Sequence, residues 1–132
     1  VSYDTVSGDL SYFTTGYGAE HETRLGYDPA TRSIFFGAYN APYLRQWHID
    51  TGVVEEKTSI PEYMLNDIFC SDRSGHIYAA GSSSGRTLFQ YDVETDSWSS
   101  IPDLPSDHGN NGCCTVAGGG YLCVASGSNL MW

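Results

Sequence analysis

Basic residues and long apolar runs are both scarce in this chain, and each shortage narrows the possible functions. Six of the 132 residues are Lys or Arg, whereas 16 are Asp or Glu, so the formal net charge is −10 at pH 7. Binding to a phosphate backbone needs clustered basic side chains, so this balance argues against a nucleic-acid partner. No apolar run is long enough to span a bilayer, so we expect no membrane partner either. The acidic balance favours solubility over the alternative, a role in binding or steering cations.

Sequence motifs for common catalytic and metal centres are also missing. The chain contains no G-x-S-x-G elbow, no H-E-x-x-H helix motif, no P-loop and no C-x-x-C pair, so we expect neither a catalytic set nor a cofactor or metal. The four cysteines are Cys70, Cys113, Cys114 and Cys123. A disulfide between Cys114 and Cys123 across a glycine turn is one option, and thiols that pack as small hydrophobic groups are the favoured one. The cysteines therefore do not determine the cellular compartment, and a secreted protein is one of the options.

Helical periodicity is absent, and the composition favours strands instead. The chain has 15 Gly and 10 Tyr, and only 17% of its residues are charged. Many glycines and aromatic residues with few lysines suit short strands joined by tight turns. The segment TLFQYDVETDSW, residues 87–98, is the clearest example, because an apolar run enters an acidic turn and leaves toward Trp98. We therefore expect an all-β fold.

The 87–98 segment has copies elsewhere in the chain. The turn landmarks Tyr3, Trp47 and Tyr91 are 44 residues apart each time, and we expect them to pack in the core rather than stack on a ligand. A second set of landmarks, the starts of three apolar strands, has spacings of 43 and 45 residues: Ile34, Ile77 and Leu122. Three repeats of 44 residues equal the 132 residues given. A period of about 40–50 residues with short strands indicates propeller blades of four strands each.

The best copy of the repeat also resembles a known family. It contains IYAAG, then YDVETDSW, then a Leu-Pro loop. An aliphatic strand ending in small residues, a Tyr-Asp-x-x-Thr turn, a Trp and a Pro-containing loop are similar to a kelch-type β-propeller blade. Propellers with other turn signatures are the alternative. The resemblance implies three four-stranded blades, with units at about 21–59, 63–104, and 108–132 joined with 1–16.

Three blades are too few for a closed ring, because propellers have about four to eight. A whole number of repeats favours self-association as a homodimer, in which a second copy of the chain completes a six-bladed ring. A piece of a longer natural propeller is the alternative. A dissected or engineered assembly without natural activity would have the same sequence features.

The loops that precede the innermost strands contain the candidate ligand site. His21, Tyr63 and His108 occupy matching positions in the repeat, each preceded by a carboxylate residue, and three residues further on are Arg24, Asn66 and Asn111. In a ring these side chains would surround one mouth of the channel. They could bind a glycan or a protein through hydrogen bonds and aromatic stacking. In a second interpretation they only satisfy nearby backbone groups, and in a third their histidines bind a metal.

The sequence favours a non-enzymatic binding or assembly module. The alternative is part of a propeller enzyme such as a polysaccharide lyase. In that case His21 or Tyr63 would abstract a proton and Arg24 would neutralise a uronate carboxylate. This alternative depends on analogy between folds, and cleavage of a uronate polymer would test it.

Overall fold

A computed structural model gives the architecture of residues 2–3, 6–7, 10–11, 24–37, 42–62, 68–80, 86–105, 113–117 and 120–125. These described residues form twelve strands and no helix. The all-β class expected from the sequence is therefore confirmed for this part of the chain. Consistent with that, the described residues offer no helix that could cross a membrane.

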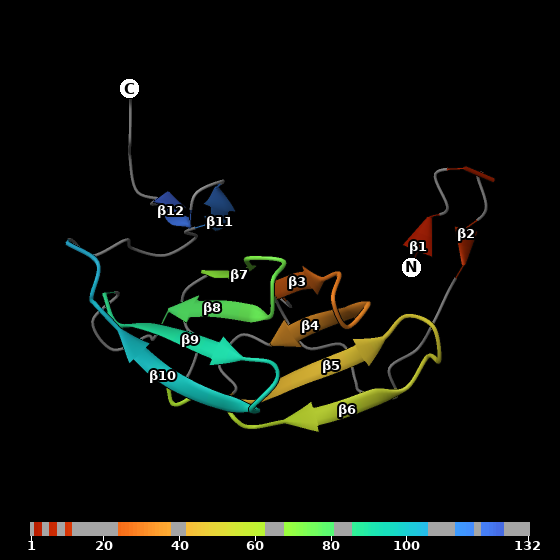
Figure 1. The fold of residues 1–132 in the computed structure, drawn as a ribbon, viewed down its shortest axis with the longest axis horizontal. Coiled ribbons are helices and arrows are strands. Elements are labelled where there is room, and N and C mark those ends of the chain that lie inside the picture. Colours follow the sequence, from red (N-terminus) through yellow and green to blue (C-terminus); the bar gives the residue numbers. More distant parts are fainter. Residues whose placement is uncertain are drawn as a thin grey trace.

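Two four-stranded antiparallel sheets dominate the structure (Figure 1). The first sheet contains β3 (Arg24–Asp28), β4 (Ser33–Gly37), β5 (Leu44–His48) and β6 (Val54–Lys57). The second sheet contains β7 (Phe69–Ser71), β8 (His76–Ala80), β9 (Leu88–Asp92) and β10 (Ser97–Ile101). In both sheets each strand pairs with the next one along the chain. The two sheets are therefore consecutive meanders with the same topology.

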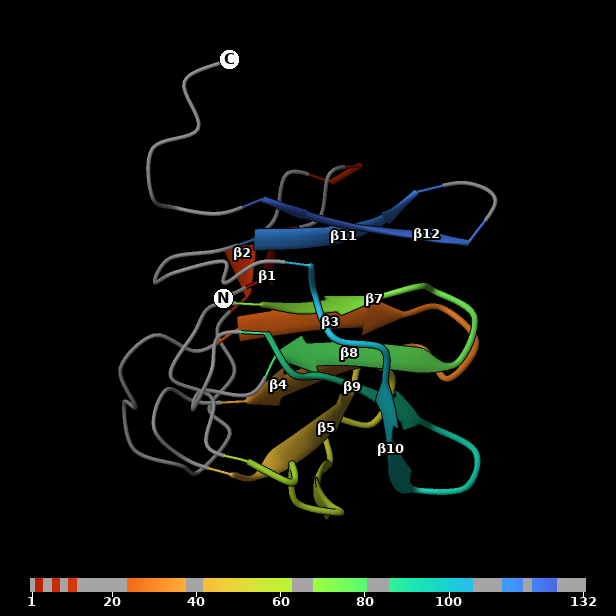
Figure 2. The same ribbon diagram turned by 90° about the vertical axis from the view of Figure 1, so that its left-hand side faces the viewer.

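Two shorter hairpins complete the described strands. One pairs β11 (Cys113–Ala117) with β12 (Tyr121–Ala125), and the other pairs β1 (Ser2–Tyr3) with β2 (Leu10–Ser11). Strand β7 contacts both β3 and β11, so the first strands of successive sheets are neighbours (Figure 2). The β11–β12 hairpin therefore lies beside the second sheet in the same way that the second sheet lies beside the first.

The 44-residue period of the sequence recurs in the strand register. Three backbone pairs hold equivalent places in their hairpins: Tyr3 with Leu10, Trp47 with Val54, and Tyr91 with Trp98. Each member of one pair lies 44 residues from its counterpart in the next pair. The repeat therefore corresponds to equivalent hairpins, and the β1–β2 hairpin has the register of the outer hairpin of each four-stranded sheet.

A carboxylate at the end of a strand organises two of the tight turns between paired strands. In the β3–β4 turn, Asp28 Oδ2 accepts hydrogen bonds from the Thr31 backbone N–H and hydroxyl at 3.0 and 2.9 Å. In the β9–β10 turn, Asp92 Oδ1 accepts one from the Thr95 N–H at 2.8 Å. Asp side chains favour turns because they bind backbone donors two or three residues ahead. These contacts explain why the acidic segments of the sequence are turns.

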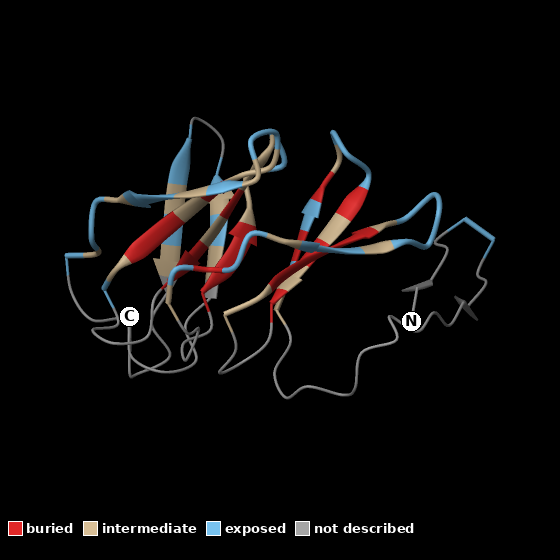
Figure 3. Cartoon of the chain, turned by 90° about the horizontal axis from the view of Figure 1, so that it is seen from below, coloured by how far each residue is buried: buried red, intermediate tan, exposed pale blue. Residues whose placement is uncertain are grey.

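The main core lies between the two four-stranded sheets, where buried residues gather (Figure 3). Phe35 of the first sheet and Tyr91 of the second are both fully buried, with ring centroids 6.0 Å apart. The other buried members of this cluster come from both sheets and from the loop after β6: Leu44, Ile60, Phe69, Ile77 and Ala79. Trp47 is also buried. The expectation that Trp47 and Tyr91 pack in the core is confirmed, while the Tyr3 side chain lies outside the described residues.

A second cluster covers the opposite face of the second sheet. Ile68, Ala80 and Leu88 are buried there, against half-buried side chains of the third hairpin that include Leu122 and Val124. The second sheet is therefore packed on both faces, by the first sheet on one side and by β11–β12 on the other. Alternate residues of a strand point to opposite faces, which accounts for the continuous apolar character of β8 and β9.

Polar contacts also tie the first sheet to the second. The Asp96 carboxylate Oδ1 accepts hydrogen bonds from the Tyr91 hydroxyl at 2.6 Å and from the Thr58 backbone N–H at 2.9 Å. The Trp98 indole N–H donates to the Thr58 carbonyl at 2.9 Å. Burial alone would raise the pKa of Asp96, but hydrogen bonds from Tyr91 and Thr58 outweigh it and lower that pKa. Burial, followed by the bond to Asp96, raises the pKa of Tyr91.

The described cysteines Cys70, Cys114 and Cys123 are free thiols, as the favoured option from the sequence required, and the alternative disulfide is excluded. Cys123 lies directly across from Thr115, and Cys114 lies across from Val124. Cys114 and Cys123 are therefore on opposite faces of their hairpin, and the Cys123 thiol is exposed and outside any disulfide. A disulfide between them is wrong for this register, because cross-strand bonding needs both side chains on one face.

Candidate functional site

The predicted channel-mouth residues lie mostly outside the described part of the chain. Of the six candidates, five are in this category: His21, Tyr63, Asn66, His108 and Asn111. Arg24 is described and is the first residue of β3, half-buried, with its backbone across from Gly37. The candidate ligand site at the starts of the inner strands therefore stays a prediction.

A cavity lies at the other end of β3, between the two four-stranded sheets. Its volume is about 410 Å³, and three turns line it. The β3–β4 turn contributes Asp28, Ala30 and Thr31, the β7–β8 turn Ser74, Gly75 and His76, and the β9–β10 turn Asp92, Val93 and Glu94. The cavity thus combines turns from both sheets, and all of its described ionisable side chains are acidic or histidine.

Asp28 is the buried carboxylate of this cavity. Its side chain is 0% exposed, and while Oδ2 is held by Thr31, Oδ1 is buried without any hydrogen-bond partner. A Cβ built on Gly26 would lie 3.4–3.5 Å from Phe69, Ser71 and Ile77, so this face of β3 points toward the second sheet. Asp28 is two residues further along the strand and shares that face. Its carboxylate is therefore directed into the space between the sheets, where the cavity lies.

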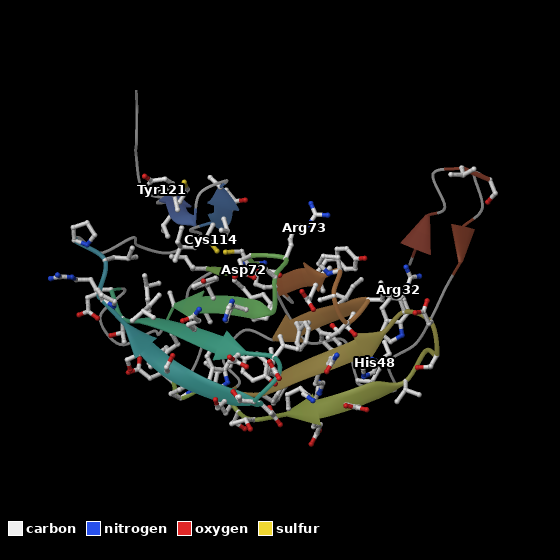
Figure 4. All side chains as sticks on the ribbon, viewed as in Figure 1. Arg32, His48, Asp72, Arg73, Cys114 and Tyr121 are labelled. Carbon is white, nitrogen blue, oxygen red and sulfur yellow. The ribbon has the colours of Figure 1, made fainter. Side chains whose placement is uncertain are left out.

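His76 belongs to a polar cluster beside the same cavity. Its Nδ1 lies 2.8 Å from Asp72 Oδ2, and its Nε2 lies 4.0 Å from Asp92 Oδ2. Asp72 Oδ1 also accepts the N–H groups of Ser74 and His76 (Figure 4 labels Asp72). Burial would raise the pKa of Asp72, but these hydrogen bonds outweigh it and lower that pKa. The Asp72 carboxylate is thus fully partnered within its own turn.

A serine, a histidine and a glutamate adjoin one another in the first sheet. Ser33 Oγ lies 3.2 Å from His48 Nδ1, and His48 Nε2 lies 3.5 Å from Glu55 Oε1. Ser33 is fully buried, and its hydroxyl donates to the Thr31 carbonyl at 3.0 Å. Because its single proton is already donated, the hydroxyl is not poised for removal by His48. These residues form a structural polar network rather than a nucleophilic centre.

Neither Asp28 nor His76 is among the site residues expected from the sequence. One signal was available, because Asp28 and Asp72 are 44 residues apart and therefore occupy one position of the repeat. The two carboxylates occupy the same repeat position but have different neighbouring residues, so the repeats differ chemically at this position.

Neither a metal site among the described residues nor a known protein family is identified. Within the described residues, no group of three or more His, Cys, Asp or Glu side chains is arranged to hold a metal ion. Comparison of the chain with protein-family models and with curated proteins finds no match.

Proposed function

We propose that this chain is a β-propeller segment that works as a non-enzymatic assembly module, in which a second copy supplies the remaining blades. The observation that supports the proposal is the outer face of the first sheet. That face carries the exposed apolar side chain of Leu25, whose counterpart in the second sheet is buried against a neighbouring sheet.

Leu25 and Phe69 illustrate this equivalence. They are 44 residues apart, and they occupy the innermost strands β3 and β7. Phe69 is 6% exposed because it packs on Gly26 of the first sheet, whereas Leu25 is 62% exposed. Tyr27, on the same face of β3, is also exposed. An exposed apolar face of this kind marks an interaction site, and the repeat indicates that its partner is another sheet of the same type.

The other end of the described fold offers a matching surface. Among the described residues, the β11–β12 hairpin has two strands where the preceding sheets have four, and its Tyr121 is 71% exposed. The β1–β2 hairpin has the register of an outer hairpin, so β1 of one copy could pair with β12 of another. Completion of a sheet in this way would cover two strand edges that have no partner among the described strands, and uncovered edges favour aggregation.

The loops before the innermost strands remain the proposed ligand site of the assembled ring. A glycan or a protein is the proposed ligand class, with Arg24 as the described member of the set. Assembly would bring two copies of these loops to one mouth, so ligand binding should depend on association.

A charge on the outer face of β3 tests the proposal. We expect Leu25→Glu to raise the dissociation constant of the assembly at least about a hundredfold, because an unpaired charge would be buried in the contact. The fold should be retained, since Leu25 is largely exposed within one chain. Sedimentation velocity would measure association, and far-UV circular dichroism would measure folding.

Val53→Glu is the matched control, because Val53 is 50% exposed in the turn before β6, away from β3. It introduces the same charge and should leave association unchanged. Equal association of Leu25→Glu, Val53→Glu and the parent chain would contradict the proposed contact.

A further inference from the structure

The cavity beside Asp28 contains a buried carboxylate oxygen that the protein leaves without a donor. Asp28 is 0% exposed, and its Oδ1 has no hydrogen-bond partner. A buried carboxylate without a full set of donors is costly, so such oxygens are normally bonded to the protein, to water or to a ligand. The position of Asp28 at an open cavity of about 410 Å³ allows a ligand to supply the missing donor.

The equivalent carboxylate in the second sheet shows what is different at Asp28. Asp72 has His76 four residues ahead, and the His76 imidazole contacts Asp72 Oδ2 at 2.8 Å. Four residues after Asp28 is Arg32, whose guanidinium binds Asp50 instead, through Nε at 2.7 Å and Nη2 at 2.8 Å. The side chain that could complete the Asp28 site is therefore engaged elsewhere, and the donor must come from outside the turn.

The other ionisable residues around the cavity favour a positively charged donor. Asp92 and Glu94 also line the cavity, and its described lining residues include no Lys or Arg. The described carboxylates and histidines are not grouped to hold a metal ion. We propose that this cavity binds an organic cation, an ammonium or guanidinium group, whose N–H donates to Asp28 Oδ1 in a charge-assisted hydrogen bond. This site lies within one copy of the chain, so it does not depend on the proposed assembly.

Binding of two small cations would test the site. Methylguanidinium and n-butylammonium would be titrated into the isotopically labelled chain, with the backbone amides of Gly75 and Val93 as reporters in NMR spectra. We expect saturable shifts with at least one cation, and none with urea, which has the shape of guanidinium without its charge. The preferred cation would identify the head group that the cavity accepts.

The variant Asp28→Asn separates recognition from folding. Asn can still accept the Thr31 hydrogen bonds through its one oxygen, and it then presents an NH₂ donor where Oδ1 accepts in the native chain. We expect the affinity for the preferred cation to fall at least about tenfold. Asp103→Asn, which makes the same change of charge at an exposed loop residue, should bind like the parent chain.

Three results would overturn the proposal. They are shifts that do not saturate, equal binding by Asp28→Asn and the parent chain, and equal responses to urea and the cations. Each would show that Asp28 does not form a selective site for an organic cation. None of them would bear on assembly, which is measured by sedimentation of a different variant.

Discussion

Replacing Phe35 by alanine should lower the free energy of unfolding by about 3–5 kcal/mol. Phe35 is fully buried in β4 and contacts Tyr91, so its ring belongs to the contact that holds the two four-stranded sheets together. Removal would cost the transfer free energy of the ring and leave a cavity that two stacked sheets cannot easily close. Small domains are stable by only about 5–15 kcal/mol, so the variant should be close to unfolding.

Urea unfolding, followed by circular dichroism at one fixed protein concentration, would measure this loss. Phe35→Leu keeps most of the apolar volume and should cost less than Phe35→Ala. Val53→Ala, at an exposed turn, should change stability by no more than about 0.5 kcal/mol. Similar stability of Phe35→Ala and Val53→Ala would mean that the two sheets do not share this core.

Replacing Asp96 by alanine should cost about 2–4 kcal/mol, because one carboxylate oxygen accepts two hydrogen bonds, one from within the second sheet and one from the residue that follows β6 of the first. The donors are the Tyr91 hydroxyl and the Thr58 N–H. Loss of the acceptor would leave the hydroxyl of buried Tyr91 without this partner. Alanine also fits poorly at the Asp96 backbone, whose φ is +49°.

Asp96→Gly separates the hydrogen bonds from the backbone effect. Glycine adopts a positive φ readily, so this variant avoids the backbone strain of alanine. Its greater freedom in the unfolded chain costs about 0.5–1 kcal/mol, and a larger loss of stability would come from the missing carboxylate. We expect Asp96→Gly to be less stable than the parent chain and more stable than Asp96→Ala. The same urea titrations would compare all three. A glycine variant as stable as the parent would show that the Tyr91–Asp96–Thr58 contacts contribute nothing.

The strands and their repeat could be predicted from the sequence because both depend on local patterns. The acidic turn after Tyr91 and the Trp that follows it define the β9–β10 hairpin, and the spacing of 44 residues located its counterparts. Backbone pairing at Tyr3 and Leu10 has the register that this spacing requires. Turn chemistry and alternation act over a few residues, so they can be read without knowledge of the packing.

The chemistry of the cavity could not be predicted in the same way. Asp28 has the sequence context of a turn residue. It differs locally from Asp72 in having Arg32 rather than His76 four residues ahead, but this difference alone does not reveal which carboxylate Arg32 binds. The distinction depends on Arg32, which binds Asp50, 18 residues away in the chain and across the strand pair. It depends also on the stacking of two sheets, which brings the β7–β8 and β9–β10 turns beside β3. Neither the choice of ion-pair partner nor the stacking is specified by residue spacing alone.

Sedimentation velocity of the parent chain over a dilution series tests the central claim most directly, because blade completion by a second copy requires association. We predict a species of twice the chain mass at high concentration, which dissociates to single chains on dilution. A single-chain mass at every concentration, with circular dichroism showing an intact β fold, would contradict the account.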